Sequence, residues 1–472
     1  MSISILLVQD TLAQDADLSV YGCGTLTPKE EINKIYRHAP DLINMKRTAV
    51  ADTLPLSIHL VGNDNGTGHL NTDQLLRMLC RINERYSGTG ISFYIMWPIH
   101  FINNSTYYKH TASVGLQMMR EYNIPNSINV YFVNDPDGTC GYYHPSGGAV
   151  AIKNQCAGIN STTLTHELGH FLGLPHTFYG WEDGDTPTNP EKVTRGPGAN
   201  CSTAGDGFCD TDADYLANRW NCPYRGNKID INGDLYHPDS SLYMSYAADI
   251  CMSRFSNMQI AWMQNTIEAY PELTAAASPS YSDFSSPTVL YPTDSIHANL
   301  MYLIWNSVDN AEVYHVRVTQ KGTGTLLTES ITADTILPLN HNMVQNNSYN
   351  IRIAPMNGIN VCRSNSFSKD FIYTNAPTDL TLLSFSDIPP GVRIFPNPVA
   401  QTLNISLDFM PEGNYRISLR NITGQLVHQY NFNHTKVNST IHIDVSSFAN
   451  GLYFIYLIGG NKTTSQKLFI TH

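Results

Sequence analysis

The pattern of apolar residues divides the chain into two parts. In the first, runs of apolar residues typical of buried strands alternate with segments of helical periodicity. The predicted strands of this part lie at Leu54–Val61, Ile91–Ile95, Ile128–Val133 and Val150–Ile152. A helix capped by Asn71 is expected to run to about Tyr86, and another is expected to begin near Ser161–Thr163. This alternation predicts a mixed sheet backed by helices, with Val150–Ile152 as the edge strand on which an extended peptide can pair.

The second part is rich in short strands. Its first group of strands, over residues 288–375, follows a linker at 273–287 in which Ala, Ser and Pro become frequent. The predicted strands of this group are Leu303–Trp305, Val313–Val318 and Ser348–Ile353. A second linker, 376–390, precedes the strands of residues 391–472, which are Leu403–Leu407, Tyr415–Leu419, Gly451–Tyr456 and Lys467–Ile470. Both groups predict all-β domains.

Length and composition limit the classes of function. A chain of 472 residues is expected to hold about three domains. The net charge is −12 with dispersed acidic residues, so no nucleic-acid partner is expected. No apolar run reaches the roughly 20 residues of a transmembrane segment. Only 14% of residues are charged, which favours an extracellular protein rich in loops and strands. The apolar stretch Ile3–Val8 fits the tail of a truncated signal peptide within residues 1–15, and cytosolic residence is the competing interpretation.

The segment His166–His176 carries the strongest chemical signal. His166 and His170 are four residues apart and would share one face of a helix, while His176 can supply a third nitrogen ligand. Gly173 permits the left-handed turn that brings the chain back after the helix. Three nitrogen ligands leave one tetrahedral zinc position open, as catalytic zinc sites do. Glu167 is placed to act as a general base on water at that position. A surface helix that carries histidines by chance is the alternative.

A second segment supports the zinc interpretation. The segment Ser241–Tyr246 places Met244 and Tyr246 downstream of the histidines. Together with the extended histidine motif it resembles the metzincin clan, in which a methionine turn lies beneath the zinc. The resemblance implies that Met244 is this methionine and that Tyr246 directs its phenol towards the metal or the developing oxyanion. Taken alone, Met244 would more simply be a core methionine.

Three separated segments carry a closer resemblance. They are His176-Thr-Phe178, Gly205–Thr211 and the run from Tyr243 through Phe255. Over residues 51–272 the chain resembles the pappalysin family of metzincins. The resemblance implies an α/β (α+β) catalytic domain with a mixed five-stranded sheet and a zinc helix. With two all-β sandwich domains after it, the predicted fold class is multidomain.

Nine cysteines fit an oxidising compartment. Four of them lie between the third histidine and the segment after Met244, and the residues alone allow three pairings among these four. The pappalysin resemblance implies the pairs Cys201–Cys222 and Cys209–Cys251. Cys140 and Cys156 flank a predicted strand and are a further candidate pair. A second zinc cluster is the rival interpretation, but the chain has no CxxC pair.

Cys23, in Tyr21-Gly-Cys-Gly24, stands apart from this cluster. Its thiolate can occupy the open zinc position, and the resemblance implies such a cysteine switch in a latent zymogen. Residues 1–50 would then be a signal remnant and prosegment, with Lys46-Arg47 as the expected cleavage site. The alternative is an unpaired thiol without a role.

Two acidic groups offer oxygen ligands for calcium. Asp206 and Asp210 belong to the first group, and Asp230–Asp234 is the second. The resemblance favours a structural calcium ion, but solvated turn residues explain both groups equally well.

The two C-terminal domains suggest how the protein is presented. Residues 288–375 resemble a fibronectin type III-like sandwich. Phe395-Pro-Asn-Pro398, the Gly451-Leu-Tyr453 strand and the terminal Lys467–Ile470 resemble the C-terminal sorting domain of Bacteroidetes type IX secretion cargo. The resemblance implies the type IX secretion machinery as a partner and a secreted or surface-attached location. Another β-sandwich binding module is the alternative.

The sequence therefore predicts a secreted zinc-dependent endopeptidase that hydrolyses extracellular proteins and is made as a latent zymogen. The alternative is a surface adhesion or binding protein with an inactive metzincin domain. Substrate preference is left open. Pappalysin-like enzymes often cut before basic residues by means of an acidic group near Asp249, but here Ile250 directly precedes Cys251.

Overall fold

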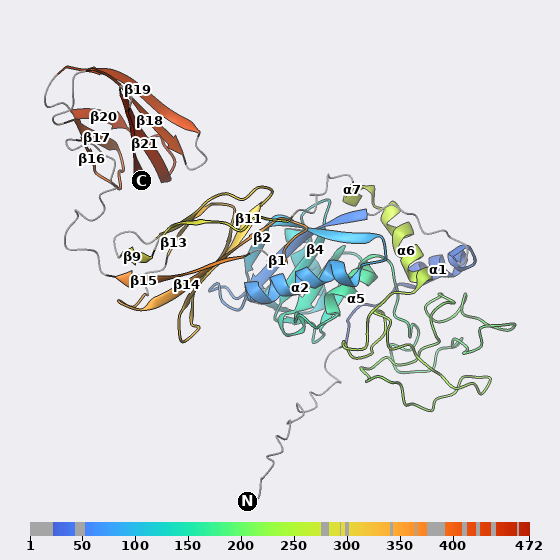
Figure 1. Ribbon diagram of the computed structural model, residues 1–472. Helices are drawn as coiled ribbons and strands as arrows, with labels where there is room; N and C mark the ends of the chain where they lie inside the picture. The colour runs from blue at the N-terminus through green and yellow to red at the C-terminus, as the bar shows by residue number, and fades with distance from the viewer. Residues whose placement is uncertain are drawn as a thin grey trace, which may run out of the picture.

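The computed structural model shows an α/β unit followed by two units built of β-sheets (Figure 1). It describes residues 22–42, 52–274, 283–292, 294–297, 302–339, 343–363, 366–374, 392–407, 413–421, 425–435, 440–459 and 462–472. The expected signal remnant, Lys46-Arg47 and most of both expected linkers lie outside these residues. Among the described residues, no helix is long and apolar enough to cross a membrane.

The first unit is built on a mixed five-stranded sheet of order β2-β1-β4-β7-β6. Its strands are β1 (Asp52–Gly62), β2 (Ile91–Asn103), β4 (Ile128–Val133), β6 (Gly141–His144) and β7 (Ala149–Lys153). Neighbouring strands are parallel except β6, which runs antiparallel to β7. The predicted mixed sheet of five strands is therefore confirmed.

The edge strand differs from the prediction. Val150–Ile152 lies in β7, between β4 and β6, and so it is not at an edge. The chain reverses after β6, and the outer edge belongs to Gly141–His144. The prediction was wrong because an apolar run such as Val150–Ile152 is typical of an interior strand that is buried on both faces. The true edge strand has the more polar sequence Gly-Tyr-Tyr-His.

Helices cover both faces of this sheet. They are α1 (Lys29–Leu42), α2 (Thr72–Arg85), α3 (Ser105–Tyr108), α4 (Ala112–Tyr122), α5 (Thr163–Phe171), α6 (Asn257–Glu268) and α7 (Pro271–Thr274). Short elements β3 (Lys109–His110), β5 (Asp135–Pro136) and η2 (Asn154–Cys156) complete the unit. The Asn71 side chain accepts a hydrogen bond from Gln74 N at 3.2 Å, as an N-cap does. Helices α2, α5 and α6 share one large core with the sheet, and α4 packs with a smaller one.

The segment between α5 and α6 is almost without regular structure, and disulfides hold it. The structure pairs Cys201 with Cys209 and Cys222 with Cys251, at Cα separations of 5.1 and 6.2 Å. The predicted pairs Cys201–Cys222 and Cys209–Cys251 are therefore wrong. A tight turn joins Cys201 to Cys209, because Gly205 and Gly207 adopt φ of 57° and 83°. The expected pair Cys140–Cys156 is present.

The second unit contains two sheets that share one core around Trp305. Their orders are β13-β10-β8 and β12-β11-β14-β15-β9. The strands are β8 (Val289–Tyr291), β9 (Ser295–His297), β10 (Tyr302–Trp305), β11 (Val313–Gln320), β12 (Leu326–Thr332), β13 (Ile336–Pro338), β14 (Ser348–Met356) and β15 (Phe367–Thr374).

The third unit also contains two sheets, of order β16-β17-β20 and β19-β18-β21-β22. Its own core includes Leu403, Ile417 and Leu468. The strands are β16 (Val392–Phe395), β17 (Thr402–Leu407), β18 (Gly413–Asn421), β19 (Leu426–His434), β20 (Thr440–Asp444), β21 (Gly451–Gly459) and β22 (Lys462–Ile470).

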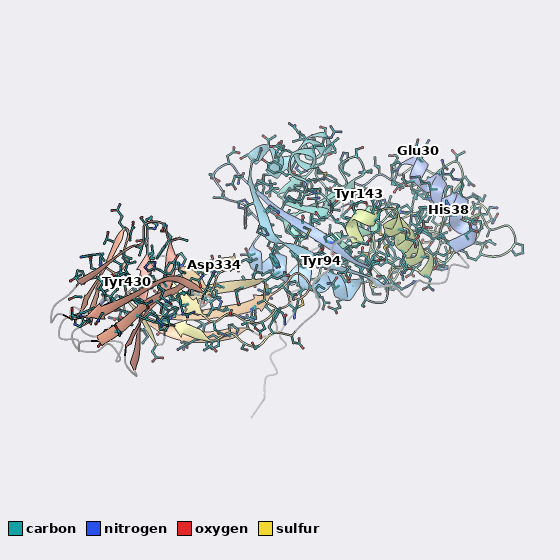
Figure 2. The ribbon with its side chains drawn as sticks, turned by 90° about the horizontal axis from the view of Figure 1, so that it is seen from above. Glu30, His38, Tyr94, Tyr143, Asp334 and Tyr430 are labelled. Atoms are coloured by element: carbon teal, nitrogen blue, oxygen red, sulfur yellow. A yellow bond between two sulfur atoms is a disulfide. The ribbon has the colours of Figure 1, made fainter. Side chains whose placement is uncertain are left out.

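The second unit is attached firmly to the first. A disulfide that the sequence did not suggest joins Cys80 of α2 to Cys362, after β14. Ile95 N donates a hydrogen bond to Gly358 O at 2.8 Å, and Arg363 forms an ion pair with Asp73. Figure 2 shows Tyr94 of β2 on the side of the first unit that faces the second unit, whereas His38 of α1 lies at the opposite end of the first unit. These contacts make the second unit a support for α2 and β2.

We expect a Cys80→Ser/Cys362→Ser double variant to lose stability at this junction, by about 2–4 kcal/mol, because the bond no longer restricts the unfolded chain. Thermal unfolding and limited proteolysis of wild type and variant measure the loss. Peptide mapping without reductant should recover Cys80 linked to Cys362 from the wild type, and free thiols at both positions would contradict the assignment.

Candidate active site

Helix α5 positions the first two histidines. His166 and His170 lie one turn apart on this buried helix, as the motif predicts. Gly173 follows with φ of 85°, and a Cβ there would come within 2.9 Å of Trp262 Nε1 and Thr266 Oγ1. Trp262 Nε1 in turn donates to Gly173 O at 3.0 Å. The predicted glycine turn is therefore confirmed, and α6 packs directly against it.

The three imidazoles converge on one point. His170 Nε2 lies 3.1 Å from His166 Nε2 and 3.2 Å from His176 Nε2. Nitrogen ligands around a tetrahedral zinc ion are separated by about 3.3 Å when each Zn–N bond is about 2.0–2.1 Å. Cys23 Sγ joins them, since the ligand atoms of all four residues lie within 4.8 Å of one another. The donor set and its spacing fit a tetrahedral metal ion.

Hydrogen bonds on the other ring nitrogens orient two of these imidazoles. His166 Nδ1 bonds Tyr243 O at 2.6 Å, and His170 Nδ1 bonds Leu174 O at 2.7 Å. A carbonyl can only accept, so each Nδ1 carries the hydrogen and each Nε2 keeps its lone pair. Burial lowers the pKa of His166 to about 4, which also favours the neutral ligand form. His176 Nδ1 lies 3.7 Å from Glu182 Oε1.

Glu167 lies beside this cluster and is fully buried. Its Oε2 accepts a hydrogen bond from Thr25 Oγ1 at 3.0 Å and lies 3.4 Å from Cys23 Sγ. Burial raises the pKa of Glu167 to about 8. A carboxyl group in a dry environment next to a metal ion can exchange a proton with water at neutral pH.

Met244 lies under the metal-binding helix. It is completely buried, and a Cβ on Gly169 would come within 2.5 Å of its sulfur. Met244 O also accepts a hydrogen bond from Thr177 N at 3.1 Å. No motif in the sequence points to Gly169, whose missing side chain allows this close contact.

Tyr246 lies at the rim of the cluster. Its ring centroid is 5.1 Å from that of His176, and its hydroxyl donates to Cys23 O at 3.0 Å and accepts from Cys23 N at 2.9 Å. In this arrangement the phenol ring faces the three histidines, but its hydroxyl is hydrogen-bonded to the backbone of Cys23.

The segment Gly22–Thr25 runs along the free edge of β6. Cys140 N donates to Gly22 O at 3.0 Å, and Gly24 N donates to Gly141 O at 2.9 Å. The Thr25 hydroxyl accepts from Tyr143 N at 2.8 Å while it donates to Glu167. Thr25 is not among the residues predicted from the sequence, where only its position two residues after Cys23 points to it. This edge is therefore covered by residues of the same chain.

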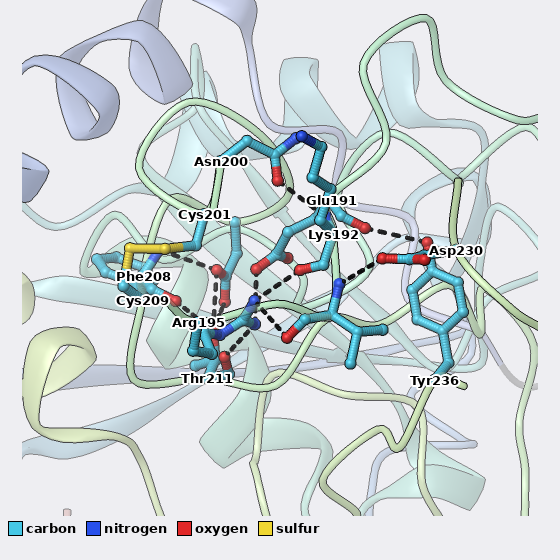
Figure 3. Close-up of polar contacts among 12 residues, drawn as sticks. Glu191, Lys192, Arg195, Asn200, Cys201, Phe208, Cys209, Thr211, Asp230 and Tyr236 are labelled. Carbon is cyan, nitrogen blue, oxygen red and sulfur yellow. Dashed lines mark hydrogen bonds and ion pairs between the residues drawn. A yellow bond between two sulfur atoms is a disulfide. The ribbon is translucent and has the colours of Figure 1, made fainter. Parts of the chain in front are cut away.

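The acidic residues proposed for calcium bind different groups. Asp206 accepts from Phe208 N at 2.9 Å and from the Thr211 hydroxyl at 3.0 Å. Figure 3 shows Thr211 in a polar network with Arg195 and Glu191. Burial raises its pKa to about 8. Asp210 instead accepts from Ser256 Oγ and Met258 N, both at 2.8 Å, and so caps α6. A calcium ion at Asp206 or Asp210 stays a prediction.

A buried three-histidine site with a neighbouring glutamate, on a helix that packs against a mixed sheet, is typical of a metalloprotease. Comparison with known proteins agrees. Residues 146–268 match the family model described as pregnancy-associated plasma protein-A, which confirms the pappalysin resemblance. Residues 393–471 match the secretion system C-terminal sorting domain.

Two curated relatives are extracellular metalloproteases of fungi. The one from Colletotrichum graminicola is 25% identical over 282 residues, which cover 53% of this chain and 90% of the relative. The one from Arthroderma benhamiae is 28% identical over 270 residues, covering 52% and 82%. A solved structure, mirolysin in complex with compound 9, aligns with 48% of this chain and 96% of its own at 16% identity and a TM-score of 0.36. Together with the sorting domain, the relatives indicate a secreted or cell-surface protein.

We expect His170→Ala to abolish tight metal binding, because His170 Nε2 is the nitrogen that lies within 3.2 Å of both others. Elemental analysis of the purified protein should find about one zinc per chain in the wild type and little in the variant. The exposed His472, at the C-terminus, provides the control: His472→Ala should bind as much zinc as the wild type. Equal zinc in His170→Ala and wild type would contradict the assignment.

Proposed function

We propose that the chain is a zinc endopeptidase that acts outside the cell and is made in a latent form. The observation that carries the proposal is the convergence of three imidazole nitrogens, 3.1–3.2 Å apart, beside the buried carboxyl group of Glu167. The nitrogen-only set of three protein ligands favours zinc and leaves one position for water or substrate. The extracellular metalloproteases to which the chain is similar support the same activity.

The residues of the site divide the reaction among them. Bound zinc supplies Lewis-acid polarisation of the scissile carbonyl and lowers the pKa of water. Glu167 takes a proton from the attacking water and returns it to the leaving amine. The Tyr246 hydroxyl, once free of Cys23, donates a hydrogen bond to the developing oxyanion. The free edge of β6 holds the substrate backbone in an extended form.

Glu167→Ala should lower peptidase activity by about a thousandfold, because it removes the buried carboxyl group beside the histidines that moves the proton. Zinc content should not change, since Glu167 is not among the ligands. Hydrolysis of casein by each protein after cleavage at Lys46-Arg47, with and without 1,10-phenanthroline, measures the activity. Glu268→Gln, at the exposed end of α6, is the matched control and should remain active. A zinc-loaded Glu167→Ala variant with wild-type activity would refute the role of Glu167.

We further propose that Gly22–Thr25 keeps the enzyme latent. Cys23 Sγ lies within ligand distance of the three histidines, its backbone engages Tyr246, and Thr25 engages Glu167. Every group assigned to the reaction is thus held by the same short segment. Helix α1 anchors it from the other side, because Tyr36 of α1 donates to Gly205 O at 2.9 Å. Residues 1–50 then form the signal remnant and prosegment, and 51–272 the catalytic domain.

Cys23→Ala should raise the activity of the uncut chain at least tenfold, because the thiol no longer competes for the open zinc position. Cleavage at Lys46-Arg47 is blocked in this experiment by Lys46→Ala/Arg47→Ala, so that prosegment removal cannot supply the activity. The uncut Lys46→Ala/Arg47→Ala chain with Cys23 intact should stay silent. If both uncut proteins were equally silent after zinc loading, Cys23 would not be the latency switch.

The two β units present the peptidase to its surroundings. Each consists of two sheets around one core, as a β-sandwich does. We assign residues 288–375 to a fibronectin type III-like domain, joined by linkers 273–287 and 376–390 to its neighbours. Residues 391–472 form the sorting domain, whose partner is the type IX secretion machinery.

A further inference from the structure

A hollow leads away from the metal site. Near His166 and Glu167 it is lined by Thr163, Arg219 and Asp249. The same three residues line a wider hollow next to it, with a volume of about 360 Å³. Its other walls are uncharged: Gln155, Gly158, Ser161 and the disulfide-bonded Cys140 and Cys156. A substrate side chain next to the scissile bond has room here.

The only charged residues of the wider hollow, among those described, are paired with each other. Arg219 Nη2 lies 3.2 Å from Asp249 Oδ1, and Arg219 Nη1 donates to Ala247 O at 2.8 Å. Asp249 Oδ1 also accepts from Thr162 Oγ1 at 2.6 Å and from Thr162 N at 3.3 Å. Both side chains are partly shielded, with 18% and 34% of their surface exposed.

This ion pair determines whether the hollow attracts or repels a charged side chain of the substrate. A lone carboxylate would attract the ammonium or guanidinium group of a substrate. Here the Asp249 charge is already compensated, and an incoming cation meets a second cation, Arg219, next to the carboxylate. An anionic side chain is repelled by Asp249 and gains little from Arg219, because the guanidinium already binds Asp249 and the backbone carbonyl of Ala247. Charged substrates therefore lose attraction and meet like-charge repulsion.

We propose that Arg219 determines substrate preference by neutralising Asp249, so that this hollow selects an uncharged side chain beside the scissile bond. The inference rests on the proposed peptidase function and assigns the substrate class of that same site. Arg219 acts through Asp249 and is a specificity residue, with no part in the chemical step. Arg219 lies three residues before Cys222, and the Cys222–Cys251 disulfide and the pairing of Trp220 with Ala247 hold it near Asp249.

The test is a peptide library, randomised at four positions on each side of one scissile bond, offered to the full chain after its prosegment is removed. Wild type should prefer uncharged residues at one of these positions and disfavour both Lys/Arg and Asp/Glu. Arg219→Gln exposes Asp249 and should raise the relative kcat/KM for Lys/Arg there about tenfold. Asp249→Asn leaves the positive charge of Arg219 without its carboxylate partner and should raise the relative kcat/KM for Asp/Glu by a similar factor.

The opposite directions of the two single variants distinguish charge selection from a loss of structure, which would lower all rates alike. The double variant Arg219→Gln/Asp249→Asn should return to the uncharged preference. Arg225→Gln changes an exposed arginine six residues after Arg219 and should keep the wild-type profile. A wild-type preference for Lys/Arg at either position next to the scissile bond, or no charge-dependent shift in the single variants, would overturn the inference while leaving the peptidase in place. No cleavage of any peptide by the zinc-loaded, processed wild type would overturn both.

Discussion

The meeting of three buried imidazoles at one point is the constraint on which the rest of the catalytic unit depends. Nitrogen lone pairs 3.1–3.2 Å apart repel one another unless a cation lies between them. The surrounding chain must therefore hold the rings without water and with their Nε2 atoms inward. The carbonyls of Tyr243 and Leu174 do so by bonding Nδ1, and Met244 fills the space that Gly169 leaves below the helix. Leu174 lies near the start of the segment between α5 and α6, and Tyr243 and Met244 lie near its end, so the disulfides of this segment also stabilise the metal site.

The same geometry makes the proposed latent form and the proposed catalysis mutually exclusive. Gly22–Thr25 pairs with the edge of β6, the strand at which an extended substrate would bind. Thr25 also occupies the carboxyl group of Glu167, and Cys23 occupies the hydroxyl of Tyr246. A substrate cannot reach one of these groups without displacing the segment from all of them. Removal of the segment thus acts as a single switch, because its contacts with the edge and with the reacting groups are made within four residues.

Prediction from sequence succeeded where residue spacing alone fixes geometry. The histidine motif and Gly173 are local, since one helix and one glycine turn place all of them. The sheet was predicted with its edge in the wrong place, because an apolar run does not reveal which strand will cover it. Thr25, Arg219 and the Cys80–Cys362 bond could not be predicted, because only the fold brings the partners together. Thr25 contacts Glu167 across 142 residues, Arg219 contacts Asp249 across 30, and the disulfide spans 282.

The correction of the disulfides changes how the long segment between α5 and α6 works. Crossed pairs would have tied its halves into one unit. The observed local pairs make two independent clamps, which close loops of 8 and 29 residues. The first clamp encloses Gly205 and Gly207, on which Ile35 and Tyr36 of α1 pack, so it serves the latent form. The second encloses Met244 and Asp249 and is bounded by the strand pairing near Arg219, so it serves the metal site and the substrate hollow. Because the clamps are separate, a change at the surface that binds α1 need not move the walls of the active site.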